Sequence, residues 1–289
     1  MTLARSTWDI RALRYVFAAG VLLSTTAQAQ QADRALVAMP SSDLPDAPLP
    51  ASQPAALNPT AAAATSSADE TSSPTLKGLP ARFLRDEVHI FTSPARLRKA
   101  DLTWLLPLAG ATAASFATDS YTMRNVVSRD AGFNSASVTT SDVLRGVAIG
   151  VPVLMYVAGG STKQEQTRDT GMLAGEAMID AYVFSEVVKY ATLRERPAKN
   201  NANGRFYTGD AVSDPSFVSG HSIVTWSSAA VLACQYHRPW QQIGIYTLAS
   251  GASLTRVLGQ QHFPTDALLG SAAGWLIGHY VARAHHRKQ

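Results

Sequence analysis

The chain has 289 residues, of which 16% are charged, and its formal net charge is +4 at pH 7. This small, scattered excess is too weak to indicate nucleic-acid binding, although it suits an anionic substrate or a membrane surface. The only cysteine, Cys234, excludes an intramolecular disulfide; it lies in an apolar run, where a buried core residue is expected rather than a nucleophile.

Residues 1–29 have the pattern of a secretory signal peptide. Arginines precede a short apolar run from Tyr15 to Leu23, and small residues follow up to Ala29. The run is much shorter than the roughly 20 residues that span a bilayer, which argues against a membrane anchor. The pattern predicts cleavage after Ala29 and export to the periplasm or cell envelope.

Residues 30–80 are rich in Ala, Pro and Ser. They hold eight of the fifteen prolines and no aromatic residue. Such a segment buries too little apolar surface to offset the entropy of the chain, so we expect a disordered tether.

Residues 81–289 contain six long apolar runs rich in Ala, Leu and Gly, and no convincing alternation of apolar and polar residues. Runs of this length favour helices over strands. They predict an all-α bundle of about six core helices, with the functional site at helix ends. The runs are 102–117, 143–159, 171–190, 219–235, 243–258 and 265–282.

Three polar segments separate these runs, at 119–142, 159–168 and 197–215. The last is long for a turn, and such loops often serve as lids or binding edges. Several runs are just short of a membrane span, whereas 171–190 carries three acidic residues, which slightly favours a soluble or peripheral bundle.

The first group of candidate site residues is Lys189 and Arg196, followed by Pro197. A spacing of seven residues places both cations on one helical face, and the proline is expected to end that helix. Such a pair is usually a solvated face, but together with Arg256 it makes a cradle for a phosphoryl group, since the planar guanidinium matches paired phosphate oxygens.

The second group is Ser219-Gly220-His221, which follows a turn at Pro215 and opens an apolar run. Serine at a helix start is most often an N-cap, but the free N–H groups there also bind phosphate oxygens, and glycine permits close approach. A histidine in this position is equally compatible with a core role and with acid–base work.

The third group is Arg256, His262 and Asp266. Pro264 is suited to the first position of the last helix, which puts His262 just before that helix. Asp266 would then lie in the first turn, where it either complements the helix dipole or accepts a hydrogen bond from the imidazole.

Taken together, the three groups resemble the three-part signature of the type 2 phosphatidic acid phosphatases, a superfamily that includes class A acid phosphatases and vanadium haloperoxidases. The resemblance covers roughly residues 170–285. Val218 and Thr255 depart from the usual pattern, where proline and serine are common. Loss of the proline puts rate rather than mechanism in doubt.

The resemblance implies a metal-independent phosphatase without a cofactor, acting on phosphomonoesters or on lipid mono- or diphosphates through a phosphohistidine. In it, His262 is the nucleophile, Asp266 orients it, and His221 protonates the leaving group and then activates water. Lys189, Arg196, Ser219, Gly220 and Arg256 hold the phosphate oxygens. The partners expected are a phosphorylated substrate, with a lipid among the candidates, and a membrane surface.

Three alternatives remain open at this point. The same cradle would hold vanadate in a haloperoxidase, and a non-catalytic phosphate-binding or membrane scaffold protein would explain the cations alone. A serine hydrolase using Ser219 is disfavoured, because the surrounding residues lack the Gly-x-Ser-x-Gly pattern and no strand precedes them.

Overall fold

The computed structural model describes residues 76–93 and 98–285. The predicted signal peptide and residues 30–75 of the predicted tether lie outside these ranges. The end of the predicted tether, residues 76–80, is described and is helical, because a 3₁₀ turn at Leu76–Gly78 leads directly into a helix that begins at Leu79. The helical domain therefore begins slightly before the predicted boundary.

The described residues form α-helices joined by loops and by short 3₁₀ and π turns, without a strand, which confirms the predicted all-α class. Each of the six predicted runs coincides with one helix. An additional N-terminal helix, α2, was not predicted. The helices are α2 (Leu79–Thr92), α3 (Leu102–Tyr121), α4 (Ala131–Ser161), α5 (Glu165–Thr192), α6 (Gly220–Gln235), α7 (Pro239–Leu258) and α8 (Pro264–Ala284).

The predicted polar connection at 119–142 is wrong over most of its length. A π-helical turn at Thr122–Val126 extends α3, and α4 already begins at Ala131. The Asp130 carboxylate accepts a hydrogen bond from the Phe133 N–H and so caps α4. The Ser141 hydroxyl donates to the Ala252 carbonyl at 3.1 Å, so this polar residue lies in the contact between α4 and α7 and not in a loop.

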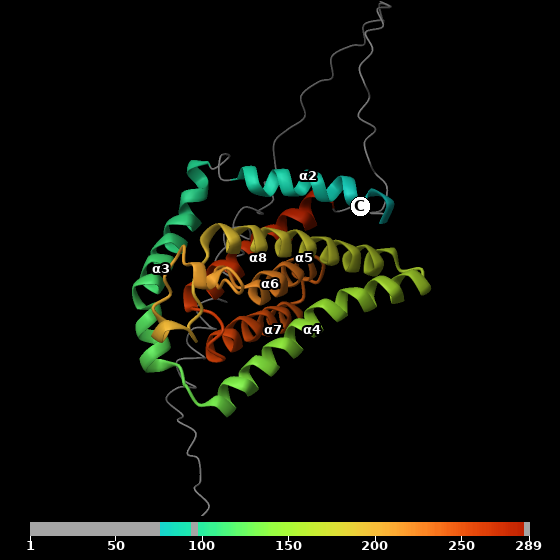
Figure 1. Cartoon of the computed structure of the whole chain (residues 1–289). Helices are drawn as coiled ribbons and strands as arrows, with labels where there is room; N and C mark the ends of the chain where they lie inside the picture. Colours follow the sequence, from blue (N-terminus) through green and yellow to red (C-terminus); the bar gives the residue numbers. More distant parts are fainter. Residues whose placement is uncertain (1–75, 94–97, 286–289) are drawn as a thin grey trace, which may run out of the picture.

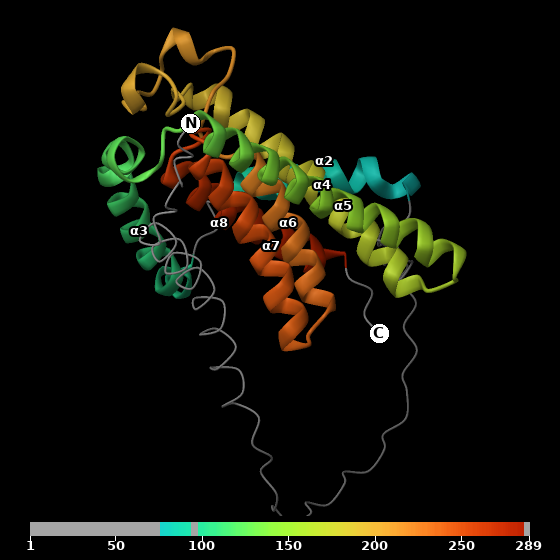
Figure 2. The ribbon, with the colours of Figure 1, turned by 90° about the horizontal axis from the view of Figure 1, so that it is seen from below.

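Helix α6 lies at the centre of the bundle (Figure 1). Its residues from Ser222 to Val231 are all buried, which is the pattern of a helix enclosed by its neighbours. Figure 2 shows α4 and α5 as a long antiparallel pair across the bundle, with α3 apart at one side. The segment between α5 and α6 gathers at one end of the molecule, near the end of α3.

Three glycines spaced by four residues let α8 approach α6 closely. A Cβ atom added at Gly274 would lie 2.2 Å from the Ile223 carbonyl oxygen, and one at Gly278 would lie 2.2 Å from that of Ser227. At Gly270 the added atom would lie 2.9 Å from the Ser219 carbonyl oxygen. The two helices therefore touch through their backbones along this stripe, as in small-residue packing motifs.

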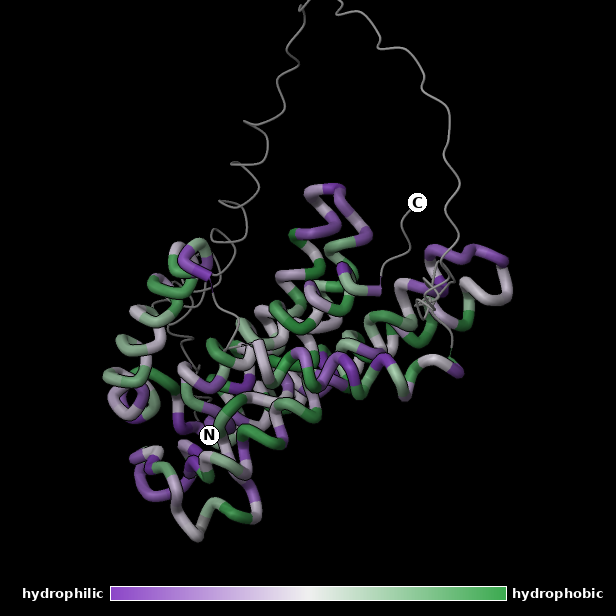
Figure 3. Tube along the Cα trace, turned by 90° about the horizontal axis from the view of Figure 1, so that it is seen from above, coloured by the Kyte–Doolittle hydropathy of each residue, from purple (hydrophilic) through white to green (hydrophobic). Residues whose placement is uncertain are grey.

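Many large apolar side chains are exposed on the outer helices. They include Leu106 on α3 and Val153, Leu154 and Val157 on α4. Among the described residues, α4 alone is long and apolar enough to cross a membrane by length and composition. Figure 3 shows that hydrophilic residues gather at the loop tips between the helices.

Candidate phosphoryl-transfer site at the helix ends

The predicted site residues come from the ends of four helices. Lys189 is in the last turn of α5, and Arg256 is in the last turn of α7. Gly220 begins α6, and Pro264 begins α8 directly after His262 and Phe263. The expected position of the site at helix ends agrees with this arrangement.

The start of α6 is organised as predicted. The Ser219 hydroxyl accepts a hydrogen bond from the Ser222 N–H at 3.4 Å and caps the helix. A Cβ atom added at Gly220 would lie 3.2 Å from the Lys189 ammonium nitrogen, so the cation sits against this glycine. The ammonium also pairs with Glu186 at 2.6 Å. The Ser219 N–H donates to the Asp266 carbonyl at 3.0 Å, which joins the starts of α6 and α8.

Arg196 does not share a helical face with Lys189, contrary to the prediction. Helix α5 ends at Thr192, and its cap Leu193 adopts left-handed dihedral angles, so the chain turns away before reaching the arginine. Arg196 reaches the site from the following loop. Its guanidinium donates to the Gln261 carbonyl at 3.0 Å and pairs with Asp214 at 2.7 Å.

His262 is buried, and its Nδ1 atom faces Asp266 and Ser216. The Nδ1 atom lies 3.7 Å from Asp266 Oδ2 and 3.4 Å from Ser216 Oγ. The Ser216 hydroxyl donates to the same carboxylate oxygen, which also accepts from the Phe263 N–H at 2.9 Å. Asp266 is thus fixed beside the imidazole partly through Ser216, and Nε2 of His262 is left free of this network.

Arg194 holds the other side of Asp266. Its guanidinium pairs with Asp266 Oδ1 at 2.6 Å and with Asp119 Oδ2 at 2.7 Å. Asp119 in turn accepts from the backbone N–H and the hydroxyl of Thr265. The guanidinium carbon lies 4.1 Å from the centre of the Phe263 ring. We call Arg194, Asp119, Asp266, Thr265 and Ser216 the Arg194 network; it ties α3 and the 193–219 loop to the start of α8.

Two arginines beside His262 have unused hydrogen-bond donors. The Nε–H groups of Arg196 and Arg256 are buried and have no partner among the described residues. Buried donors without an acceptor are costly, and guanidinium groups match paired oxyanion oxygens. The arrangement is therefore suited to an anion between these two side chains.

His221 contacts a carboxylate that the sequence motifs did not indicate. Its Nε2 atom lies 2.7 Å from Oδ1 of Asp142 on α4, and the same oxygen lies 3.6 Å from Nη1 of Arg256. Asp142 therefore links the second and third groups of the predicted site. Arg145, one turn further along α4, adds positive charge near the same histidine.

Burial and the arginines keep both imidazoles neutral in the free protein. Burial, Arg256 and Arg145 lower the pKa of His221 to about 3. Burial and the nearby Arg196 and Arg256 lower the pKa of His262 to about 4 although Asp266 opposes the shift. Burial lowers the pKa of Arg256 to about 10, with a contribution from Arg196. A bound anion would offset this crowding of cations and raise these values.

Burial alone would raise the pKa of Asp266, but the neighbouring His262, the ion pair with Arg194 and the hydrogen bond from Ser216 hold it below its ordinary value. This carboxylate therefore remains charged beside the histidine. Its partners Arg194 and Ser216, like Asp142, were missed because each lies far along the chain from the residue it contacts. The position of Arg194 two residues before Arg196 was the one available signal.

The buried Nε–H groups of Arg196 and Arg256 at the helix ends are suited to an oxyanion such as phosphate or vanadate. Residues 170–289 match the PAP2 superfamily. The family predicted from the three motifs is thereby confirmed.

One curated relative is the protein named lipid A 1-phosphatase from Porphyromonas gingivalis. It is 31% identical over 71 residues, which make up 24% of this chain and 16% of that protein. The matched part is thus a small fraction of the relative's length. No solved structure gives a significant match.

Proposed function

We propose that the chain is a phosphatase that hydrolyses the phosphate ester of a lipid, without a catalytic metal, through a phosphohistidine on His262. The observation that carries this proposal is the pair of buried, unpartnered Nε–H groups of Arg196 and Arg256 beside a neutral imidazole. Phosphoryl transfer requires mainly alignment and charge stabilisation, which these groups supply together with Lys189.

In the first step, Nε2 of His262 attacks phosphorus, and the bond from phosphorus to the ester oxygen breaks. The leaving oxygen takes a proton from His221, whose pKa rises once the phosphate offsets the charge of Arg256. In the second step, water attacks phosphorus and gives a proton back to His221, and the bond from phosphorus to Nε2 of His262 breaks. The products are the alcohol, inorganic phosphate and the original enzyme.

Asp266 keeps Nδ1 of His262 protonated and so leaves Nε2 as the attacking atom. Ser219 and the N–H groups at the start of α6 hold phosphate oxygens, as the N-terminus of a helix is suited to do. Gly220 leaves room for Lys189 next to this position.

A shallow apolar groove along α3, with Leu269 of α8 at its edge, supports a lipid substrate. Leu105, Leu108, Ala109, Phe116 and Leu269 are among the residues that line it. Phe116 also contacts Arg194, with 5.1 Å from the guanidinium carbon to the ring centre, so the groove approaches the Arg194 network. The exposed apolar faces of α3 and α4 favour contact with a membrane, and the relative's name points to a phosphorylated lipid. We further propose that the protein acts in the cell envelope after export.

Turnover of para-nitrophenyl phosphate tests the chemistry. We expect turnover to persist in the presence of a chelator and to fall about a thousandfold or more in His262→Ala. The control is His237→Ala, at an exposed histidine between α6 and α7, which should retain full activity. Acid-labile phosphate trapped on the protein should disappear in His262→Ala alone. Chelator-sensitive turnover, or full activity without His262, would exclude this mechanism.

A phosphate-release panel tests the substrate class. It compares phosphatidate, a polyprenyl diphosphate, lipid A and nucleotide monoesters on the same preparation. We expect a lipid to be preferred and substitution of Leu108 by Asp to reduce lipid turnover but not that of para-nitrophenyl phosphate. Preference for nucleotides would reject the lipid assignment, and bromide oxidation after vanadate loading would favour the haloperoxidase alternative.

A further inference from the structure

A buried acidic cluster lies between α2, α5 and the end of α8. Four carboxylates meet there, namely those of Asp86, Glu87, Glu176 and Asp180, and their exposed fractions are 0%, 9%, 1% and 0%. Isolated carboxylates are almost never buried to this extent, because leaving water is costly for a charge. The phosphatase proposed above has no use for them.

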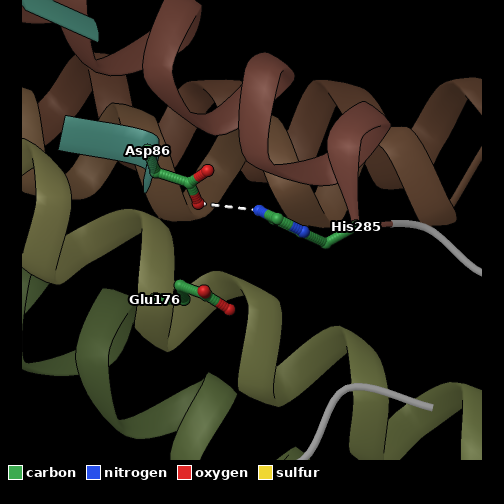
Figure 4. A group of neighbouring side chains, drawn as sticks. All are labelled: Asp86, Glu176 and His285. Carbon is green, nitrogen blue, oxygen red and sulfur yellow. Dashed lines mark hydrogen bonds and ion pairs between the residues drawn. The ribbon is translucent and has the colours of Figure 1, made fainter. Parts of the chain in front are cut away.

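Two of these carboxylates have partners. Glu176 accepts from Arg82 Nε at 2.9 Å and from its Nη2 at 3.1 Å. Asp86 lies 2.7 Å from His285 Nε2 and accepts from the Tyr280 hydroxyl at 3.0 Å. Figure 4 shows Asp86 and His285 joined in this way, with Glu176 close by on a third helix.

The other two carboxylates have none. All four side-chain oxygens of Glu87 and Asp180 are buried without a hydrogen-bond partner among the described residues. Asp180 follows Glu176 by one turn of α5, so both project from the same face towards α2. A proton would cancel the charge of Asp180 but would leave its oxygens without a partner, whereas a cation would satisfy both needs.

The ligand atoms are already close enough to share an ion. One atom each from Asp86, Glu176 and His285 lies within 4.8 Å of the others. A cation between Asp86 and His285 would take the place of the hydrogen they now share. Glu176 can ligate an ion and still bond Arg82, because a carboxylate has about four acceptor positions.

We propose that this cluster binds one divalent transition-metal ion. Asp86, Glu176 and His285, whose ligand atoms are close together, hold it, and the buried, unpartnered carboxylate of Asp180 is the fourth ligand. An imidazole among carboxylates favours zinc or manganese over calcium and magnesium, which take oxygen ligands. The ion is structural: it fastens α2 and the end of α8 to α5. Asp180 precedes Lys189 by nine residues, about 13.5 Å along α5, so the ion takes no part in phosphoryl transfer.

Metal uptake by the full chain tests the proposal without any activity assay. Chelator-treated protein is dialysed against Zn²⁺, Mn²⁺ or Mg²⁺, and its metal content and Tm are measured. We expect one equivalent of zinc or manganese and a rise in Tm of about 5 °C or more, with little effect of magnesium. Co²⁺ serves as a spectroscopic probe and should give visible absorption bands.

The matched variants are Asp180→Asn and Asp169→Asn, the same substitution on the same helix. Asp169 lies outside the cluster and pairs with Arg168. We expect Asp180→Asn to weaken zinc binding at least tenfold and Asp169→Asn to leave it unchanged. Asp180→Asn removes a buried carboxyl group that has no hydrogen-bond partner, so the variant should still fold, and circular dichroism checks this.

Failure to take up zinc or manganese, or absence of cobalt bands, would overturn the proposal. Equal zinc uptake by wild type and Asp180→Asn would also overturn it, because binding would then lie elsewhere. None of these outcomes bears on the phosphatase, since turnover of para-nitrophenyl phosphate is expected to persist in the chelated protein below its Tm.

Discussion

The Arg194 network and the acidic cluster are both buried and charged, yet they balance their charges differently. In the Arg194 network, one guanidinium lies between two carboxylates, and hydroxyl and backbone N–H groups occupy the remaining oxygens. In the acidic cluster, four carboxylates face Arg82 and His285, and two of them have no partner among the described residues. The first is complete by itself, whereas the second needs a further cation.

This difference shows where each region acts. A satisfied network fixes geometry, and here it fixes Asp266 beside His262. A cluster with unpartnered buried groups lowers the stability of the fold, and a bound ligand can remove this unfavourable free energy. The two regions therefore respond in opposite directions when a charge is deleted.

Loss of Arg194 has the largest expected effect on stability. Arg194→Met leaves Asp119 and Asp266 buried without their cation, and we expect a loss of about 3–5 kcal/mol in the free energy of unfolding. Arg168→Met, which breaks a partly exposed pair with Asp169, should cost at most about 1 kcal/mol. Urea denaturation measures both. Similar losses in the two variants would show that the Arg194 network is no more than a surface pair.

Loss of Asp180 is expected to act in the opposite direction. In chelated protein, Asp180→Asn removes a buried carboxyl group that has no hydrogen-bond partner and lies beside other carboxylates, so the free energy of unfolding should rise by about 1–3 kcal/mol. In zinc-loaded protein the same variant should be less stable than wild type, because a ligand is missing. Urea denaturation with and without zinc measures whether the effect of Asp180→Asn on the free energy of unfolding changes sign. Destabilisation under both conditions would contradict the proposed difference between the two regions.

Ser216 connects the Arg194 network to the proposed nucleophile, His262. Ser216→Ala removes the hydroxyl that lies between His262 and Asp266, and we expect kcat to fall about tenfold with little change in KM, since alignment rather than binding is affected. Ser213→Ala, an exposed serine in the same loop, is the control. An unchanged kcat would mean that Asp266 orients His262 alone.

The pH profile has the smallest expected effect. The pKa of His262 is lowered to about 4, so kcat/KM should fall below that pH as the nucleophile becomes protonated. The pKa of His221 is lowered to about 3, so this histidine is neutral above pH 3 in the free protein. The proton that the leaving group needs must then be brought in by a protonated phosphate group of the substrate. We therefore expect an acidic optimum and a several-fold decline from pH 5 to pH 8, measured after correction for substrate ionisation. An optimum above pH 7 would contradict these shifts.

Local patterns in the sequence predicted much of the fold and site. The apolar runs located α3 to α8, and the spacing of Arg256, His262 and Asp266 placed an arginine, a histidine and a carboxylate at neighbouring helix ends. These features depend on periodicity and on helix-end chemistry, which operate within a few residues.

Features that depend on contacts between distant segments were not predicted. Arg196 lies in a loop because the left-handed cap at Leu193 ends α5 one turn earlier than Pro197 would require. The contact between His221 and Asp142 spans 79 residues, and it arises because α4 begins within a segment that composition alone predicts to be a loop. Helix α2 is short and carries charges on its buried face, so it lacks the apolar run that revealed the others.

The contact between α6 and α8 has a consequence for how this protein can diversify. The backbones of α6 and α8 are in direct contact at these glycines. The spacing between the starts of the two helices therefore does not depend on the size of side chains outside this contact. Substitutions along the groove or in the 193–219 loop can then alter which molecule enters while the reacting groups keep their positions. Among similar chains, we therefore expect substrate specificity to differ often, whereas the glycines at 270, 274 and 278 should seldom be replaced.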